Sequence, residues 1–169
     1  SKYPADKAEE AFRYLEAHDV HCLLYQGRYN LFDRKPEEQG ILASAARNGT
    51  GFIAYSPLAQ GLLTDRYLNG IPEDSRMAQE RFLKKEVLTD TMLTRIRTLA
   101  QIAREREQSL AEMALAWLLK DRKVTSVIVG ASSVNQLAAN LHALAHTAFS
   151  DEELQRIEKT CMDEGENGK

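Results

Sequence analysis

The sequence predicts an α/β protein built around parallel strands, and three observations support this fold class. The spacing of apolar residues switches between helix-like and strand-like along the chain. Short apolar runs without alternation are typical of strands whose two faces are both buried, as in parallel sheets. The first two of these runs begin 30 residues apart, at Cys22 and Phe52, which is the length of one βα unit.

The first part of the chain is predicted to alternate helices with strands. Ala8, Phe12 and Leu15 share one face of a helix over residues 6–17. The apolar run 22–25 follows as the first strand. A helix over 41–46 is predicted to end at Asn48 and Gly49, and residues 51–55 form the second strand.

The second part is predicted to begin with a long irregular loop over 56–88, a length typical of functional loops. Apolar spacing predicts helices over 92–103 and 134–141, with a third strand over 124–129 between them. Ser109 with Glu112, and Ser150 with Glu153, have the spacing of capping boxes, which open two further helices.

Three parallel strands are few for this fold class, because both outer strands would have unpaired edges. The chain is therefore either a small doubly wound domain or part of a larger α/β barrel. We favour the barrel, because the residues that follow the strands resemble a ligand site at the carboxyl ends of barrel strands.

Composition excludes several classes of function. The 169 residues include 22 Lys and Arg against 25 Asp and Glu, a net charge of −3, so no basic surface for nucleic acid is predicted. No apolar run approaches the length of a membrane span. Cys22 and Cys161 suit neither a disulfide framework nor a metal site. We therefore expect a cytoplasmic protein without a metal, a membrane partner or a nucleic-acid partner.

The residues after the first two predicted strands are candidates for binding a cofactor. Gln26 follows the first strand and either faces a ring amide or caps its own turn. Tyr55 ends the second strand and offers a flat face to a heterocycle. Ser56, Leu58 and Gln60 come next and supply hydroxyl, amide and backbone donors that suit a diphosphate.

The long loop also contains Arg66 and Arg76. These arginines either close over a diphosphate or a phosphate monoester, or remain solvated charges.

The third predicted strand leads through Gly130 and Ser132 into a helix whose N-terminus is suited to an anion. Gln136 and Asn140 lie on one face of that helix, so both amides can meet a ligand along that turn. The alternative is that Ser132 or Ser133 only caps the helix.

These residues together resemble the aldo-keto reductases. The resemblance rests on Tyr-Gln-Gly-Arg-Tyr-Asn-Leu at 25–31, Ala-Tyr-Ser-Pro-Leu-Ala-Gln-Gly-Leu-Leu-Thr at 54–64, and Ser-Val-Ile-Val-Gly-Ala-Ser at 126–132. Residues 67–76 resemble the branch that holds bacterial L-glyceraldehyde 3-phosphate reductase and the potassium-channel β subunits. The resemblance implies that residues 1–169 are the C-terminal half of a (β/α)8 barrel, or TIM barrel, with strands six to eight and a cofactor-covering loop at about 56–88.

The resemblance also implies a cofactor, NADP(H), and a role for each candidate residue. Ser1 and Gln26 would hold the nicotinamide carboxamide, and Tyr55 would stack on the nicotinamide ring. The pyrophosphate would lie against Ser56, Leu58 and Gln60, with Arg66 and Arg76 folded over the cofactor. The 2′-phosphate and adenine would be held by Gly130, Ser132, Gln136 and Asn140. Ala139 stands where the branch often has Glu, and Gly130 and Gln136 stand where many relatives have Lys and Arg, so the choice between NADP and NAD stays open.

The implied reaction is hydride transfer to a small carbonyl substrate, with phosphorylated aldehydes suggested by Arg66 and Arg76. The family's proton-donating tyrosine and its lysine, aspartate and histidine belong to the first half of the barrel. No catalytic residue is therefore assigned here, and the chain alone is expected to be inactive. A non-catalytic nucleotide-binding scaffold of channel-β-subunit type is the alternative, and a free-standing α/β domain without a cofactor is a third. Pairing of edge strands in a homo-oligomer stays open.

Overall fold

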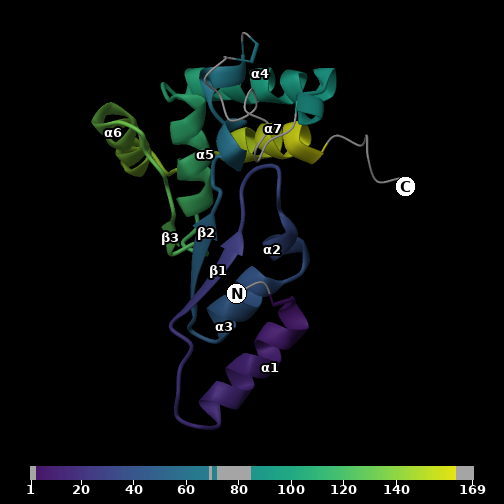
Figure 1. Ribbon diagram of the computed structural model, residues 1–169, viewed down its shortest axis with the longest axis vertical. Helices are drawn as coiled ribbons and strands as arrows, with labels where there is room; N and C mark the ends of the chain where they lie inside the picture. The colour runs from purple at the N-terminus through teal and green to yellow at the C-terminus, as the bar shows by residue number, and fades with distance from the viewer. Residues whose placement is uncertain (1–2, 69, 72–84, 163–169) are drawn as a thin grey trace.

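The computed structural model describes residues 3–68, 70–71 and 85–162. Its centre is a parallel sheet of three strands in the order β1-β2-β3, with bounds Leu24–Arg28, Gly51–Tyr55 and Ser126–Val127. The molecule is elongated, with α1 at one end of the long axis and α4 at the other (Figure 1). The seven α-helices among the described residues are α1 Ala5–Glu16, α2 Lys35–Glu38, α3 Ile41–Arg47, α4 Asp90–Glu105, α5 Leu110–Leu119, α6 Val134–His142 and α7 Asp151–Met162.

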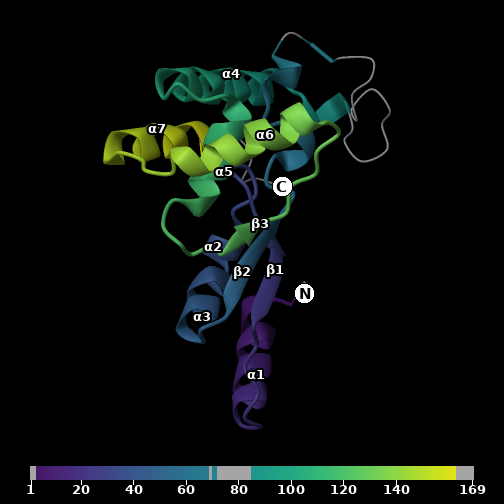
Figure 2. The same ribbon diagram turned by 90° about the vertical axis from the view of Figure 1, so that its left-hand side faces the viewer.

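Helices gather at the two ends of the sheet. The amino ends of the strands lie toward α1 and α3, and α4, α5 and α7 lie beyond the carboxyl ends (Figure 2). Short 3₁₀ turns occupy Ala59–Gly61, Asp65–Tyr67, Lys85–Val87 and Ala143–Ala145. No helix in the described part of the chain combines the length and apolar character needed to cross a membrane.

The predicted helices are confirmed, with ends that differ by a few residues, and so are both capping boxes. The backbone N–H of Ser109 donates to Glu112 at 2.6 Å, and the N–H of Glu112 donates to the Ser109 hydroxyl at 3.2 Å. Ser150 and Glu153 make the same pair of bonds at 2.7 and 3.2 Å. The short helix α2 was not predicted, because only four residues form it and its sequence is polar.

The sheet departs from the prediction at both edges. β2 has the predicted bounds, but β1 begins at Leu24 rather than Cys22, and β3 contains only Ser126 and Val127. The expectation that the first strand is buried on both faces is wrong, since Leu23 is 78% exposed and Leu24 is 46% exposed. β1 has a neighbouring strand on one side only, so its apolar residues are covered only in part by the described structure.

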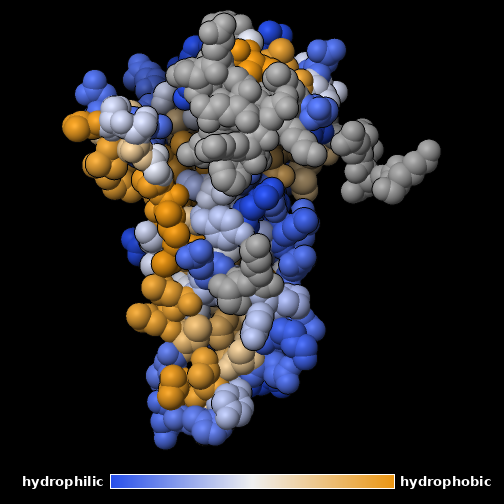
Figure 3. Space-filling view, in the orientation of Figure 1, coloured by the Kyte–Doolittle hydropathy of each residue, from blue (hydrophilic) through white to orange (hydrophobic). Residues whose placement is uncertain are grey.

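The apolar stripe predicted for α6 is likewise exposed. Val134, Leu137 and Leu141 are 83%, 44% and 57% exposed, and Leu144 just beyond the helix is also exposed. Figure 3 shows apolar residues gathered along the side of the molecule that carries α6 and, further down, toward α1. The described core instead surrounds α5, whose Trp117 is 1% exposed and packs against the ring of Tyr29.

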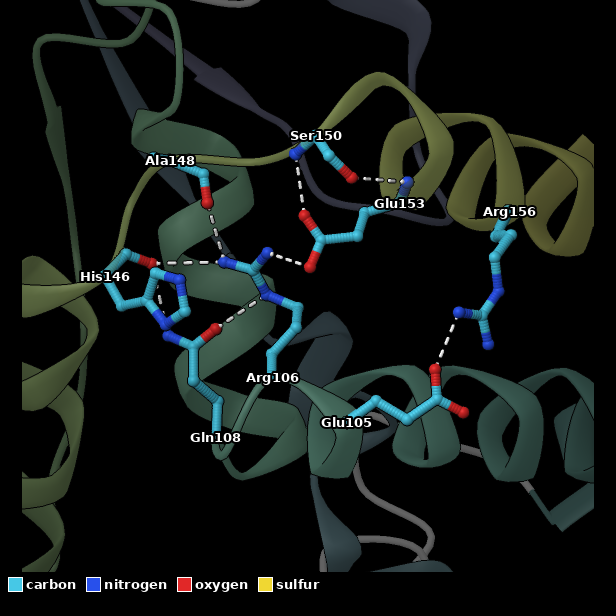
Figure 4. Close-up of polar contacts among 8 residues, drawn as sticks. All are labelled: Glu105, Arg106, Gln108, His146, Ala148, Ser150, Glu153 and Arg156. Atoms are coloured by element: carbon cyan, nitrogen blue, oxygen red, sulfur yellow. Dashed lines mark hydrogen bonds and ion pairs between the residues drawn. The ribbon is translucent and has the colours of Figure 1, made fainter.

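A buried arginine holds the C-terminal helix against the corner between α4 and α5 (Figure 4). The Arg106 guanidinium forms an ion pair with Glu153 at 2.6 Å and lies 3.7 Å from the ring centre of Phe149. It also donates to Gln108 and to the carbonyl oxygen of Ala148, each at 2.9 Å. These contacts fix the segment between α6 and α7, and thereby the position from which α6 projects.

Candidate functional site

The loop after β2 forms one wall of a cleft and has an unusual backbone. Ser56, Ala59 and Gln60 have φ angles of 52°, 46° and 59°, a left-handed region that residues other than glycine rarely adopt. The Asn30 side chain donates to the Ser56 carbonyl oxygen at 3.0 Å and so holds the first of these residues. Left-handed residues of this kind concentrate at binding and catalytic loops, where the surrounding structure compensates for the strain.

The same loop is closed on itself by backbone hydrogen bonds. Gly61 and Leu63 both donate to the Leu58 carbonyl oxygen, at 2.8 and 3.2 Å. The Thr64 hydroxyl donates to the Gly61 carbonyl oxygen at 2.7 Å and accepts from the Arg66 backbone N–H at 3.3 Å. The loop is therefore a compact corner whose shape is set before a ligand arrives.

The second wall is the segment that leaves β3 and enters α6. Its first residue, Ile128, still donates to Ala54 of β2 at 2.9 Å, and the chain then separates from the sheet. Ser133 caps α6, since its hydroxyl accepts from the Gln136 backbone N–H at 3.2 Å. Ser133 is therefore the N-cap of α6, whereas the Ser132 hydroxyl donates to the Gln136 side-chain oxygen at 3.0 Å.

The two walls enclose a cleft of about 840 Å³, within the size range of small-molecule and cofactor sites. Of the twelve predicted cofactor residues, the cleft brings together Ser56, Leu58, Gln60, Arg66, Gly130, Ser132 and Gln136. Among the described residues that line it, none is acidic and Arg66 is cationic. With the N-terminus of α6 at one wall, the charge of the cleft favours an anionic ligand.

Two buried polar atoms near this cleft have no hydrogen-bond partner among the described residues. One is the side-chain oxygen of Gln60, and the other is the amide nitrogen of Asn140, whose residue is 8% exposed. Buried polar atoms normally have a partner, so these two are candidates for contacts with a bound molecule. Gly130 also leaves room for close approach, since a Cβ added there would meet no atom within 4 Å.

The remaining predicted residues lie outside the cleft lining. Tyr55 is partly buried at the end of β2, and Asn140 lies one helical turn beyond Gln136. Gln26 is exposed inside β1, paired in register with Ile53, so the expectation that it follows the strand is wrong. The strand starts two residues later than its apolar run suggested. Ser1 and Arg76 lie outside the described residues.

Seven lining residues were not predicted as site residues: Pro57, Gly61, Thr64, Tyr67, Ile128, Val129 and Ala131. Ile128 and Val129 were assigned to the end of the third strand, but β3 ends at Val127 and leaves them as cleft wall. Thr64 closes the 56–67 loop, and its position at the end of the quoted 54–64 motif was the available signal. No group of three or more His, Cys, Asp or Glu side chains within the described ranges is arranged to hold a metal ion.

A parallel sheet with a phosphate-compatible cleft beyond its strand ends is the arrangement of nucleotide-binding α/β proteins. The profile of the "Aldo/keto reductase family" matches residues 1–161, and the chain belongs to this family. The family fold is a (β/α)8 barrel, of which the described three-stranded sheet and its helices form a part.

Curated relatives include both members of the expected branch. The L-glyceraldehyde 3-phosphate reductase of Escherichia coli O157:H7 is 46% identical over 167 residues, which cover 96% of this chain and 48% of that protein. The corresponding reductase of Escherichia coli strain K12 is 44% identical over the same length. A "Probable voltage-gated potassium channel subunit beta" of Oryza sativa subsp. japonica is 38% identical over 148 residues, covering 85% of this chain and 45% of that protein. The chain spans about half the length of these relatives.

Proposed function

We propose that this chain is the nucleotide-binding half of an NADP-dependent aldo-keto reductase that reduces small aldehydes, phosphorylated ones such as glyceraldehyde 3-phosphate among them. The observation that carries the proposal is the cleft itself. It gathers seven of the residues that the resemblance assigns to the cofactor, from two loops about 70 residues apart in the sequence, at the carboxyl ends of β2 and β3.

The residues present fit the pyrophosphate and adenosine parts of such a cofactor. The preformed loop at 56–67 and Arg66 would hold the pyrophosphate, because they offer backbone donors and a positive charge at one wall. Gly130, Ser132 and Asn140 would hold the adenosine end, where open space and an unpartnered amide nitrogen are found. The bound nicotinamide would supply the hydride for carbonyl reduction.

The proton donor is proposed to lie in the rest of the reductase, and the surroundings of Tyr29 agree with this assignment. Tyr29 is 2% exposed and donates its hydroxyl proton to Glu37. Burial first, and then the hydrogen bond to Glu37, raise the pKa of Tyr29 well above its ordinary value. A phenol that is buried and harder to ionise suits a packing role rather than proton transfer to a substrate.

We further propose that β1, β2 and β3 are strands six to eight of the barrel. The exposed apolar residues support this placement, because they lie on both edge elements: Leu23 and Leu24 by β1, and Ile128, Val134, Leu137 and Leu141 after β3. A closed barrel has no sheet edges, so neighbouring strands and helices would cover both sides.

The experiment compares the intact protein in which this chain occurs with the 169-residue chain alone. We expect the intact protein to bind NADPH, seen as a change in nicotinamide fluorescence, and to reduce glyceraldehyde 3-phosphate faster than unphosphorylated glyceraldehyde. The chain alone is expected to give no turnover. Absence of NADPH binding by the intact protein, or turnover by the chain alone, would refute the proposal.

The similarity to channel β subunits favours a second candidate function, a nucleotide-binding scaffold without reductase activity. The same experiment separates the two candidates. An intact protein that binds NADPH but reduces no aldehyde would support the scaffold.

A further inference from the structure

The open face of the sheet carries a positive charge at the carboxyl end of β1. Exposure alternates along this strand: Tyr25 is buried, whereas Leu24, Gln26 and Arg28 are exposed. Because successive side chains of a strand point to opposite faces, Gln26 and Arg28 share the open face. Arg28 is also paired in register with Tyr55, the last residue of β2. The Arg28 side chain therefore starts beside the two residues to which the resemblance assigns the nicotinamide.

An ion pair holds the Arg28 side chain by one nitrogen only. Its Nε atom lies 2.7 Å from Oδ2 of Asp33, whose side chain is 16% exposed, while the side chain of Arg28 is 54% exposed. Within the described part of the chain, the Arg28 side chain makes no other ion pair. The terminal nitrogens Nη1 and Nη2 therefore remain available, and these two atoms of a guanidinium form paired hydrogen bonds with a phosphate.

The turn that carries Asp33 is fixed by a buried asparagine. Oδ1 of Asn30 accepts hydrogen bonds from the backbone N–H groups of Phe32 and Asp33, each at 3.0 Å. Nδ2 of the same side chain donates to the Ser56 carbonyl oxygen at 3.0 Å. One residue thus sets the position of Asp33, which holds Arg28, and also the start of the loop that forms the cleft.

Arg28 and Arg66 occupy different positions at the carboxyl ends of the strands. Arg66 lines the cleft together with the residues assigned to the cofactor phosphates, whereas Arg28 lies outside that lining. A carbonyl substrate has to approach the nicotinamide end of the site, because the hydride is transferred there. A short phosphorylated aldehyde keeps its phosphate close to its carbonyl carbon. The cation that meets this phosphate is therefore expected near Gln26 and Tyr55, which is where Arg28 lies.

We propose that Arg28 binds the phosphate of a phosphorylated aldehyde and so determines the preference of the reductase for phosphorylated over unphosphorylated substrates. This inference rests on the proposed function, because it concerns the substrate side of the same site. It assigns the substrate phosphate to Arg28 and leaves Arg66 to the cofactor. Loss of Arg28 then affects phosphorylated aldehydes selectively, whereas loss of Arg66 affects every aldehyde, since all of them need the cofactor.

The test measures kcat/KM of the intact protein for glyceraldehyde 3-phosphate and for glyceraldehyde at one fixed NADPH concentration. For Arg28→Gln we expect the ratio of the two values to fall about 10- to 100-fold, because charge-assisted hydrogen bonds to the phosphate are lost. Arg28→Lys keeps the charge but lacks the planar guanidinium, so a smaller fall is expected, and this variant decides the question if Arg28→Gln does not fold.

Two further variants serve as comparisons. Arg66→Gln is expected to lower both values of kcat/KM and to leave their ratio unchanged. Arg156→Gln is the matched control, because Arg156 is 42% exposed, pairs with Glu105 through one nitrogen at 2.6 Å and lies outside the cleft lining. Its ratio is expected to equal that of the unsubstituted protein.

The possible results separate this inference from the proposed function. Equal losses for both aldehydes in the Arg28 variants, or an unchanged ratio, overturn the inference while the reductase function stands. A fall of the ratio in Arg66→Gln as large as in Arg28→Gln also overturns it, because the phosphate would then not be assigned to Arg28. An unsubstituted protein that reduces glyceraldehyde but not its phosphate has the same consequence. If the unsubstituted protein reduces neither aldehyde, the proposed function fails and the inference fails with it.

Discussion

The Arg106 cluster allows a sharp test of how burial changes the contribution of an ion pair, because the chain contains a matched pair on its surface. Arg106 and Glu153 approach to 2.6 Å, and so do Arg156 and Glu105. The Arg106 side chain is 2% exposed, whereas Arg156 and Glu105 are 42% and 43% exposed. Equal distances give equal Coulomb energies in the same medium, so burial is the main difference between the pairs.

The expected magnitudes follow from that difference. Arg106→Ala removes a buried cation from Glu153, whose side chain is 26% exposed, and it also removes a donor from Ala148. We expect it to lower the free energy of unfolding by about 2–3 kcal/mol, between the values of fully exposed and fully buried pairs. Arg156→Ala is expected to lower it by less than about 1 kcal/mol, because both partners are exposed to water and salt. Gln108 and Phe149 also lose contacts with Arg106, which adds to the first value.

The assay is urea denaturation of the intact protein, followed by circular dichroism. The free energies of unfolding of the two variants are compared if both show the same dependence of that free energy on urea concentration. If the alanine variant does not fold, Arg106→Lys is measured in its place. Lysine keeps the positive charge but lacks the planar guanidinium, so we expect a loss of unfolding free energy between those of Arg156→Ala and Arg106→Ala. Burial alone raises the pKa of Glu153, but hydrogen bonds from Ser150 and Arg106 outweigh it and hold the pKa below the ordinary 4.5. The stabilisation is therefore present above pH 4.5 and is lost as the pH falls below it. A cost for Arg106→Ala no larger than that for Arg156→Ala would refute the reasoning.

Three further predictions concern single positions. Gly130→Ala is expected to leave the melting temperature unchanged, since the added Cβ meets open space. The same substitution is expected to weaken NADPH binding in a fluorescence titration. Unchanged binding would show that no ligand approaches this backbone. Ser109→Ala removes the cap of α5 and is expected to lower the free energy of unfolding by about 1 kcal/mol in urea titrations, whereas no loss would contradict the capping role. Burial raises the pKa of the Cys161 thiol to about 12 from an ordinary 9.0, because the folded protein favours the neutral thiol. The stability that Cys161 contributes is therefore complete below pH 9.0 and is lost as the pH rises toward 12. Between pH 9 and 10 the stability difference from Cys161→Ala is expected to shrink by about 1 kcal/mol, and a constant difference would contradict the raised pKa.

The elements that local chemistry determines could be predicted from the sequence. Helix α5 begins where Ser109 and Glu112 satisfy each other's backbone groups, and this signal lies within four residues. β2 has its predicted bounds because Gly49, at φ 63°, ends the preceding turn and an apolar run follows at once. Each of these signals needs only neighbouring residues to be interpreted.

The errors at β1 and α6 have a different cause. Leu24 and Val134 were correctly identified as apolar, but an apolar pattern does not say which element covers a residue. In the described structure Val134 is 83% exposed and Leu24 is 46% exposed. The strand register also places Gln26 inside β1. Burial depends on contacts between distant segments, and here those contacts would come from the other half of a barrel under the proposed placement.

The cleft could be predicted in position but not in detail. Parallel strands put their carboxyl ends at one edge, so the loops after β2 and β3 meet once the strands are known to be neighbours. Helical spacing placed Gln136 and Asn140 on one face as equivalent ligand contacts, but the structure separates them. Gln136 is exposed and hydrogen-bonded to Ser132. Asn140 is buried, and its amide nitrogen has no hydrogen-bond partner among the described residues. The reason is that α6 meets the rest of the protein near its second turn, while its first turn projects beside the cleft. Spacing along a helix therefore identifies which side chains share a face, but the hydrogen bonds that each side chain already makes depend on its surroundings in the fold.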